Sequence, residues 1–140
     1  MASREEQILS HIATILDATT GIGTVYRSRV QAFSRDEAPA LLVEPAGCRC
    51  QEFSTCKLDW TLDVAVIIHT RGDVPDSLAD PIRVSAHALL MADRTLNNLA
   101  INISPIASDP QRDKADLTSL WLVNTYQVRF RTSATNLEAA

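Results

Sequence analysis

Two stretches of the chain alternate apolar and polar residues over about a dozen positions each. The first covers residues 57–69 and the second residues 120–131. Successive side chains of a β-strand point to opposite faces of the sheet, so this period of two predicts two long strands with one apolar face each. Those faces carry Leu58, Trp60, Leu62, Val64, Val66 and Ile68 on one strand, and Leu120, Leu122, Asn124, Tyr126, Val128 and Phe130 on the other.

Apolar residues at helical spacing predict a first helix over residues 3–17. Ser3 and Glu6, three positions apart, have the residue types of a capping box at the start of a helix. The run 19–23 is predicted to end the helix, because its glycines accept left-handed backbone geometry. The buried stripe of this helix would consist of Ile8, Leu9, Ile12, Ile15 and Leu16.

A second helix is predicted to start with Asp80 as its N-cap and Pro81 as its first helical residue. It would follow a turn at residues 72–76 and continue to about Arg94. After it, the alternation around Ile101 predicts a short strand.

The remaining strands are shorter or more polar. Residues 25–34 alternate so that Arg27 and Arg29 share one face, and residues 40–43 read as a short buried strand between two prolines. Residues 46–55 and 105–116 are predicted to be surface loops, the first because it is polar and contains cysteine. We expect one domain over residues 1–132, followed by a flexible tail at 133–140.

The two long strands are longer than the first helix. About 12 residues of strand span roughly 40 Å, whereas about 15 residues of helix span only some 22 Å. Part of the sheet should therefore extend beyond its helical cover. Since exposed apolar sheet invites aggregation, we expect another subunit or a partner to bury that part.

Composition excludes some classes of protein. With 140 residues, 46% hydrophobic content and a net charge of −4, the chain fits one globular domain and not a protein that coats nucleic acid. It shows no secretory leader and no apolar run long enough to span a bilayer, so we expect a cytoplasm-like compartment. The three cysteines cannot all pair within one chain, and we expect free thiols.

Candidate metal and catalytic residues do not form a recognised motif. Cys48, Cys50 and Cys56 would need a fourth ligand such as His69 to bind zinc, and their spacing differs from the usual pair of cysteines two residues apart. The histidines, His11, His69 and His87, are dispersed among three predicted elements. We therefore predict no catalytic residue, no metal ligand and no cofactor.

Charged residues are the remaining candidates. Asp59 and Asp63 lie about 13 Å apart along one strand, too far for a catalytic carboxylate pair, and are either solvated or counterparts of arginines. Arg27 and Arg29 either form a solvated strand face or belong to a polar interface, where arginine is enriched. Arg129 and Arg131 would enlarge such a surface if the last strand lies nearby.

The order of these elements resembles the tail terminator or minor tail proteins of lambda-like long-tailed phages and prophages. The resemblance is carried by the N-terminal amphipathic helix, the glycine turn and the segments 25–30 and 39–43. The long alternating strand, the second helix and the final strand that ends at residues 128–132 complete it. It implies helices on one side of a mixed or antiparallel sheet, and we predict an α+β fold with a mostly antiparallel sheet and two main helices.

The resemblance also implies a function. Members of this family form a hexameric ring that caps the tail tube, stops its polymerisation and offers a surface to the head-side connector or neck protein. The chain would then be a non-enzymatic virion protein of the tail, assembled in the bacterial cytoplasm, with itself, the tube protein and the connector as partners. Arg27 and Arg29 would be candidates for subunit or tube contacts.

Two other classes stay open. One is a small metal-binding or enzymatic domain built on the three cysteines and His69. The other is a ferredoxin-like nucleic-acid-binding module, which the acidic charge and the few aromatic residues disfavour. We expect no membrane contact and no direct nucleic-acid binding.

Overall fold

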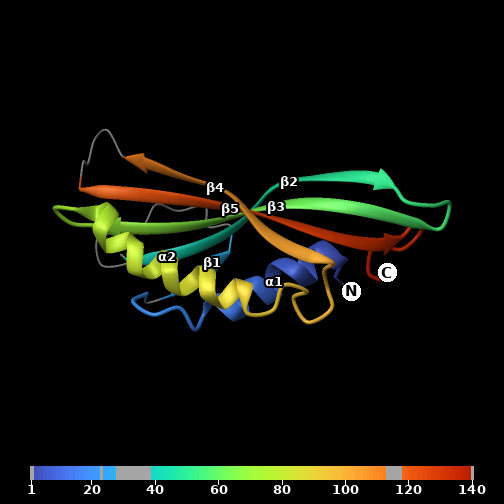
Figure 1. Cartoon of the computed structure of the whole chain (residues 1–140), viewed down its shortest axis with the longest axis horizontal. Coiled ribbons are helices and arrows are strands. Elements are labelled where there is room, and N and C mark those ends of the chain that lie inside the picture. The colour runs from blue at the N-terminus through green and yellow to red at the C-terminus, as the bar shows by residue number, and fades with distance from the viewer. Residues whose placement is uncertain (1, 23, 28–38, 113–117, 140) are drawn as a thin grey trace.

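The computed structural model describes residues 2–22, 24–27, 39–112 and 118–139. These form one five-stranded sheet in the order β1-β2-β3-β5-β4, with both helices on one side of it (Figure 1). Only β1 and β2 pair in parallel; the other three pairings are antiparallel. The predicted α+β fold is confirmed. Its elements are α1 (Arg4–Leu16), β1 (Val25–Arg27), β2 (Ala40–Glu52), β3 (Lys57–Arg71), α2 (Pro75–Met91), β4 (Asn102–Arg112) and β5 (Ser119–Ser133).

The two long alternating strands are β3 and β5, and they are neighbours. Their register places Trp60 opposite Phe130 and Leu62 opposite Val128, so the apolar residues of both strands lie on the face that carries the helices. The rings of Trp60 and Phe130 stack with their centroids 6.2 Å apart. Burying each such side chain contributes about 1.5–3 kcal/mol, which makes this face the main source of stability.

The first helix packs on this apolar face as predicted. Ser3 is its N-cap, and the Ser3 hydroxyl accepts a hydrogen bond of 3.2 Å from the backbone N–H of Glu6. Gly21, in the turn that follows, has a φ of +87°, and a Cβ there would lie 3.4 Å from Ile82 of α2. A glycine at this position therefore serves both the turn and the close approach of the helix. The buried residues of α1 are Ile8, Leu9, Ile12 and Leu16.

The second helix begins earlier than the sequence predicted. Pro75, not Pro81, occupies the start, and the hydroxyl of Thr70 donates to the Pro75 carbonyl at 2.8 Å. Pro81 lies inside the helix, where it removes one helical hydrogen bond. Because both Pro81 and Ser77, four residues before it, are exposed, water can hydrate the carbonyl that loses its donor.

The end of α2 also differs from the prediction of Arg94, since the helix stops at Met91. The carboxylate of Asp93 accepts hydrogen bonds from the backbone N–H groups of Thr95 (3.1 Å) and Asn97 (2.9 Å). These bonds satisfy the backbone of a turn and so compete with continued helix. Leu96 in this turn has a positive φ of 50°, and its side chain is fully buried.

Two predicted loops prove to be strand. Residues 46–52 belong to β2, and residues 105–112 belong to β4, which also replaces the short strand expected near Ile101. Two of the prolines near these segments lie at irregularities, because the register shifts between Pro45 and Gly47 and between Pro105 and Ala107. Proline is tolerated at edge strands and bulges, and β4 is an outer strand of the sheet.

Some predictions fall partly or wholly outside the described residues. Of the strand expected over residues 25–34, only the first three residues are described, as β1, while residues 40–43 form the buried start of β2 as predicted. The tail contacts α1, since the backbone N–H of Arg4 donates to the Leu137 carbonyl at 2.6 Å. The flexibility of residues 133–140 stays a prediction, because one set of contacts does not measure motion.

The sheet outreaches its helices at one end, as the strand lengths predicted. The hairpin formed by β2 and β3 and the C-terminal end of β5 extend past α1, at the right of Figure 1. Residues 49–56 of this hairpin are exposed. No helix in the described part of the chain is long and apolar enough to cross a membrane.

The importance of the apolar face can be tested at Leu62, which is fully buried at the centre of β3. The Leu62→Ala substitution should lower the free energy of unfolding by about 2–5 kcal/mol, because it removes buried methyl groups and leaves a cavity. Urea denaturation monitored by tryptophan fluorescence would measure it. Thr61→Ala, one residue away on the opposite face, is the control and should change the value by about 0.5 kcal/mol or less. Equal effects of the two substitutions would contradict this account of the core.

Candidate interaction surfaces

Arg27 lies on the edge strand β1 and contacts α1. Its guanidinium donates to both carboxylate oxygens of Glu6, each at 3.2 Å, and to the hydroxyl of Ser10 at 3.3 Å. This bidentate contact is the main reason that the pKa of Glu6 lies below its usual value. Arg27 therefore joins the edge of the sheet to the first helix within one chain. Its predicted role in contacts between chains stays a prediction.

The other predicted arginines do not lie beside Arg27. Arg29 is outside the described residues. Arg129 and Arg131 pair in register with Thr61 and Asp59, on the face of the sheet turned away from the helices. Because β2 and β3 separate β1 from β5, Arg27 and these two arginines do not form a single patch.

Arg131 is held on this second face by two neighbours. Its Nε donates to Oδ1 of Asp59 at 2.6 Å, and its guanidinium carbon lies 3.8 Å from the centroid of the Phe53 ring. The hydrogen bond from Arg131 is the largest cause of a lowered pKa at Asp59, and the same bond raises the pKa of Arg131. Asp63 likewise pairs with Arg49 at 3.1 Å. Both aspartates are thus counterparts of arginines, one of the two alternatives left open by the sequence.

These side chains form a charged surface, which we call the polar face. It holds four basic residues and two acidic ones, on the hairpin and on the adjoining part of β5. Arg129 is exposed, and the acidic members are both engaged in the ion pairs just described. The members of the polar face are Arg49, Lys57, Asp59, Asp63, Arg129 and Arg131.

The cysteines do not meet His69. Cys48 and Cys50 pair in register with Leu62 and Trp60, on the face that carries the helices. His69 lies towards the opposite end of β3 and on the other face, where its ring stacks on Trp121 with centroids 4.0 Å apart. Within the described ranges, no group of three or more histidine, cysteine, aspartate or glutamate residues is arranged to hold a metal ion. The ligand set of the metal-binding alternative is therefore not assembled.

The three thiols differ in their surroundings. Cys50 and Cys56 are exposed on the hairpin, whereas Cys48 is half-buried and packs against the main core. Burial raises the pKa of the Cys48 thiol to about 11, and the nearby carboxylate of Glu5 acts in the same direction. The three histidines are dispersed over α1, β3 and α2, and Nδ1 of His87 lies 2.9 Å from the hydroxyl of Tyr126.

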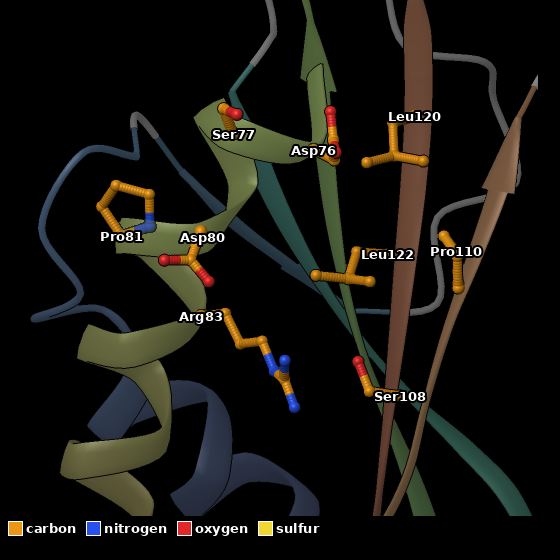
Figure 2. A pocket seen from close by; sticks show the side chains of 9 residues that line it. All are labelled: Asp76, Ser77, Asp80, Pro81, Arg83, Ser108, Pro110, Leu120 and Leu122. Carbon is orange, nitrogen blue, oxygen red and sulfur yellow. The ribbon is translucent and has the colours of Figure 1, made fainter. Parts of the chain in front are cut away.

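A groove that the sequence did not reveal runs between α2 and the strands β4 and β5. Its larger part has a volume of about 860 Å³ and adjoins a second space of about 410 Å³, with Asp80 and Arg83 lining both. The floor is apolar and includes Pro110, Leu120 and Leu122, while α2 supplies charged side chains to the wall. In Figure 2 the side chain of Arg83 extends from α2 towards the strands. We call this space the α2 groove.

Sequence reasoning missed the α2 groove because it placed the start of α2 too late and assigned most of β4 to a loop. One signal was present in the alternation of β5, where Asn124 interrupts an otherwise apolar face. Its amide donates to the Val66 carbonyl at 3.2 Å, and its oxygen accepts from the hydroxyl of Ser108 in β4 at 2.9 Å. This polar residue in a buried row also lines the space beside α2.

No protein-family model and no curated protein matches the sequence. Among solved structures, the chain is similar to one in the structure described as "Virion of native gene transfer agent (GTA) particle". The two chains share 7% sequence identity, the alignment covers 92% of each, and the TM-score is 0.49. A likeness of this degree carries no argument about function.

The contact between Arg27 and Glu6 predicts that the two residues contribute a small, pH-dependent coupling free energy to folding. Because the pKa of Glu6 is lowered in the folded chain, the pair stabilises the fold above the unfolded carboxyl pKa of about 4.3 and loses this contribution as the pH falls through the folded value. A double-mutant cycle with Arg27→Gln and Glu6→Gln should give a coupling of about 0.2–1 kcal/mol at neutral pH. Urea denaturation at pH 7 and at about pH 3 would measure it, and a coupling that did not decrease at the lower pH would contradict the assignment.

The different surroundings of the three cysteine thiols predict the order in which an alkylating reagent modifies them. At pH 8 the raised pKa leaves Cys48 with about a hundredfold less thiolate than a thiol of ordinary pKa 9.0. Iodoacetamide should therefore modify Cys50 and Cys56 first, as followed by peptide mass spectrometry. In urea, where the chain is unfolded, the three rates should converge. Fast labelling of Cys48 in the folded protein would show that the half-buried position of this residue is wrong.

Proposed function

We propose that this chain is a tail terminator protein of a lambda-like phage or prophage. In this role it forms a ring on the end of the tail tube, ends polymerisation of the tube protein and offers a surface to the head-side connector. The ring would be a homo-oligomer, a hexamer by the resemblance, located in the virion tail after assembly in the bacterial cytoplasm. The proposal includes no enzymatic activity and no cofactor.

The observation that supports this proposal best is the bare ends of the long sheet. At one end the hairpin extends past α1, and beside α2 the apolar residues Leu122 and Pro110 line an open groove. Apolar sheet that its own helices do not cover is usually covered by another protein. A subunit of an assembly needs such surfaces, and the fold is the one that the resemblance implies.

The alternatives have less support. A metal-dependent domain would need the cysteines and His69 together, but these residues lie on opposite faces of the sheet. A nucleic-acid-binding module would need an open row of cations, whereas Arg131 and Arg49 of the polar face are paired with carboxylates. In this proposal the polar face meets the tube or the connector, with Arg129 as an exposed cation that is not in an ion pair with Asp59 or Asp63.

Electron microscopy of the protein mixed with growing tail tubes tests the proposal. Tubes should stop lengthening and carry a ring at one end. Arg129→Glu should reduce the fraction of capped tubes by about tenfold or more if the polar face makes the contact, while Arg129→Lys, which keeps the charge, should retain capping. Tubes that lengthen normally in the presence of the protein, with no ring at either end, would refute the function.

A further inference from the structure

The tip of the β2–β3 hairpin is a compact projection with an apolar centre. Phe53 has an exposed fraction of 58%, and the guanidinium of Arg131 lies over its ring. The backbone N–H groups of Phe53 and Ser54 both donate to the carbonyl of Lys57, at 3.1 and 3.2 Å. The tip thus has internal contacts of its own, and an aromatic residue exposed at a protruding position is a typical anchor of an interface.

The tip also carries charge of both signs. Glu52 precedes Phe53 and is exposed, and Lys57 closes the hairpin from the other strand. In the part of the chain that the structure describes, neither side chain has an ion-pair partner. The tip thus presents an apolar ring beside Arg131 on the polar face, with Lys57 on that same face and Glu52 on the face that carries the helices.

The α2 groove has the complementary properties. Its floor of Leu120, Leu122 and Pro110 is apolar, and α2 contributes Asp76, Asp80 and Arg83 to its wall. Among the described residues, none of these three charged side chains makes a hydrogen bond or an ion pair. A ligand of this groove would gain from an apolar group on the floor, an acidic group beside Arg83 and a basic group beside the aspartates.

We infer that the α2 groove receives the hairpin tip of a second copy of this chain. Phe53 of one copy lies on the floor of the groove of the next, Glu52 pairs with Arg83, and Lys57 faces Asp76 and Asp80. The tip lies at one end of the long axis of the molecule, and α2 lies towards the other end (Figure 1). One chain therefore cannot fill its own groove, whereas neighbouring chains can fill each other's in sequence.

Such a contact joins two different surfaces, so it is heterologous. Repeated head to tail, it closes into a ring when the rotation between subunits closes, and otherwise continues as a filament. The inference rests on the proposed function, because a ring is what that function requires. It goes further by naming the two surfaces and the residues that join them.

Disulfide trapping tests the contact in the free, full-length protein. Cys56 lies in the tip, and a Ser77→Cys substitution places a second thiol on the exposed wall of the groove. Cys50→Ser is added to remove the other exposed thiol. Mild oxidation at a protein concentration of about 0.1–1 mM should give covalent dimers and higher multimers in which Cys56 of one copy is joined to the introduced thiol of the next. Mass spectrometry of the linked peptides would identify this disulfide, which we call the tip–groove linkage.

The control places the second thiol elsewhere. Thr14→Cys lies on the exposed side of α1, outside the groove, and should give at least tenfold less crosslinking than Ser77→Cys. Cys56→Ser should abolish the linkage in both backgrounds. Trapping by Ser77→Cys that does not exceed trapping by Thr14→Cys would overturn the inference.

A charge exchange tests the pairing itself. Arg83→Glu or Glu52→Arg alone should reduce the yield of the tip–groove linkage by roughly tenfold, and Phe53→Ala by roughly thirtyfold. The double variant Glu52→Arg/Arg83→Glu should recover most of the yield, because it restores opposite charges. All these side chains are exposed, and an unchanged melting temperature would verify that each variant is folded. A double variant that traps no better than the single variants would refute the proposed pairing.

The disulfide-trapping and tube-capping experiments together distinguish a failure of this contact from a failure of the proposed function. Trapping needs no tail tubes, whereas capping does. Tubes capped by a protein that shows no trapping would leave the function standing and refute this contact. Clear trapping in a protein that never caps tubes would leave the contact standing and refute the function.

Discussion

The pairing of β3 with β5 is the interaction on which the rest of the structure depends. It runs without a register shift from Lys57 opposite Ser133 to Arg71 opposite Ser119. Because both strands alternate with a period of two, this register places most of their large apolar side chains on one face, while Ile67, Trp121 and Val123 lie on the other. A slip of one residue would turn a whole apolar row to solvent, so the register is strongly specified. The apolar face then requires cover, and both helices lie on it.

The elements that the sequence revealed are those whose signal is local and uninterrupted. The alternation of β3 and β5 and the stripe of α1 needed no knowledge of their neighbours. Errors arose at prolines, whose effect depends on position in the sheet. Pro105 and Pro110 suggested a loop but lie in an outer strand, where a missing N–H is tolerated. Pro75 and Pro81 are both plausible helix starts, and only the contact of Thr70 with the Pro75 carbonyl distinguishes them.

The candidate surfaces were less predictable because they depend on which strands are neighbours. Asp59 and Arg131 are 72 positions apart in the chain and meet only through the register of β3 with β5. The sequence pattern places Arg27 on one strand face with Arg29. Its partner Glu6, however, comes from a helix whose position beside β1 the sequence does not indicate. The α2 groove involves an element whose start was misplaced and a strand assigned to a loop. No local pattern could have joined them.

The uncovered parts of this sheet follow from the geometry of its elements. A strand rises about 3.3 Å per residue and a helix about 1.5 Å, so two helices of 13 and 17 residues cannot cover strands of 15 residues and their neighbours completely. The uncovered parts of the sheet differ in the side chains that they carry. The overhanging hairpin is exposed over residues 49–56, and these residues are mostly polar, which suits water. Beside α2 the floor stays apolar while Arg83, Asp76 and Asp80 remain unpaired within the described chain. Charged groups left without partners around an apolar floor fit a surface that is completed by another protein, and the hairpin of the same chain has the matching chemistry.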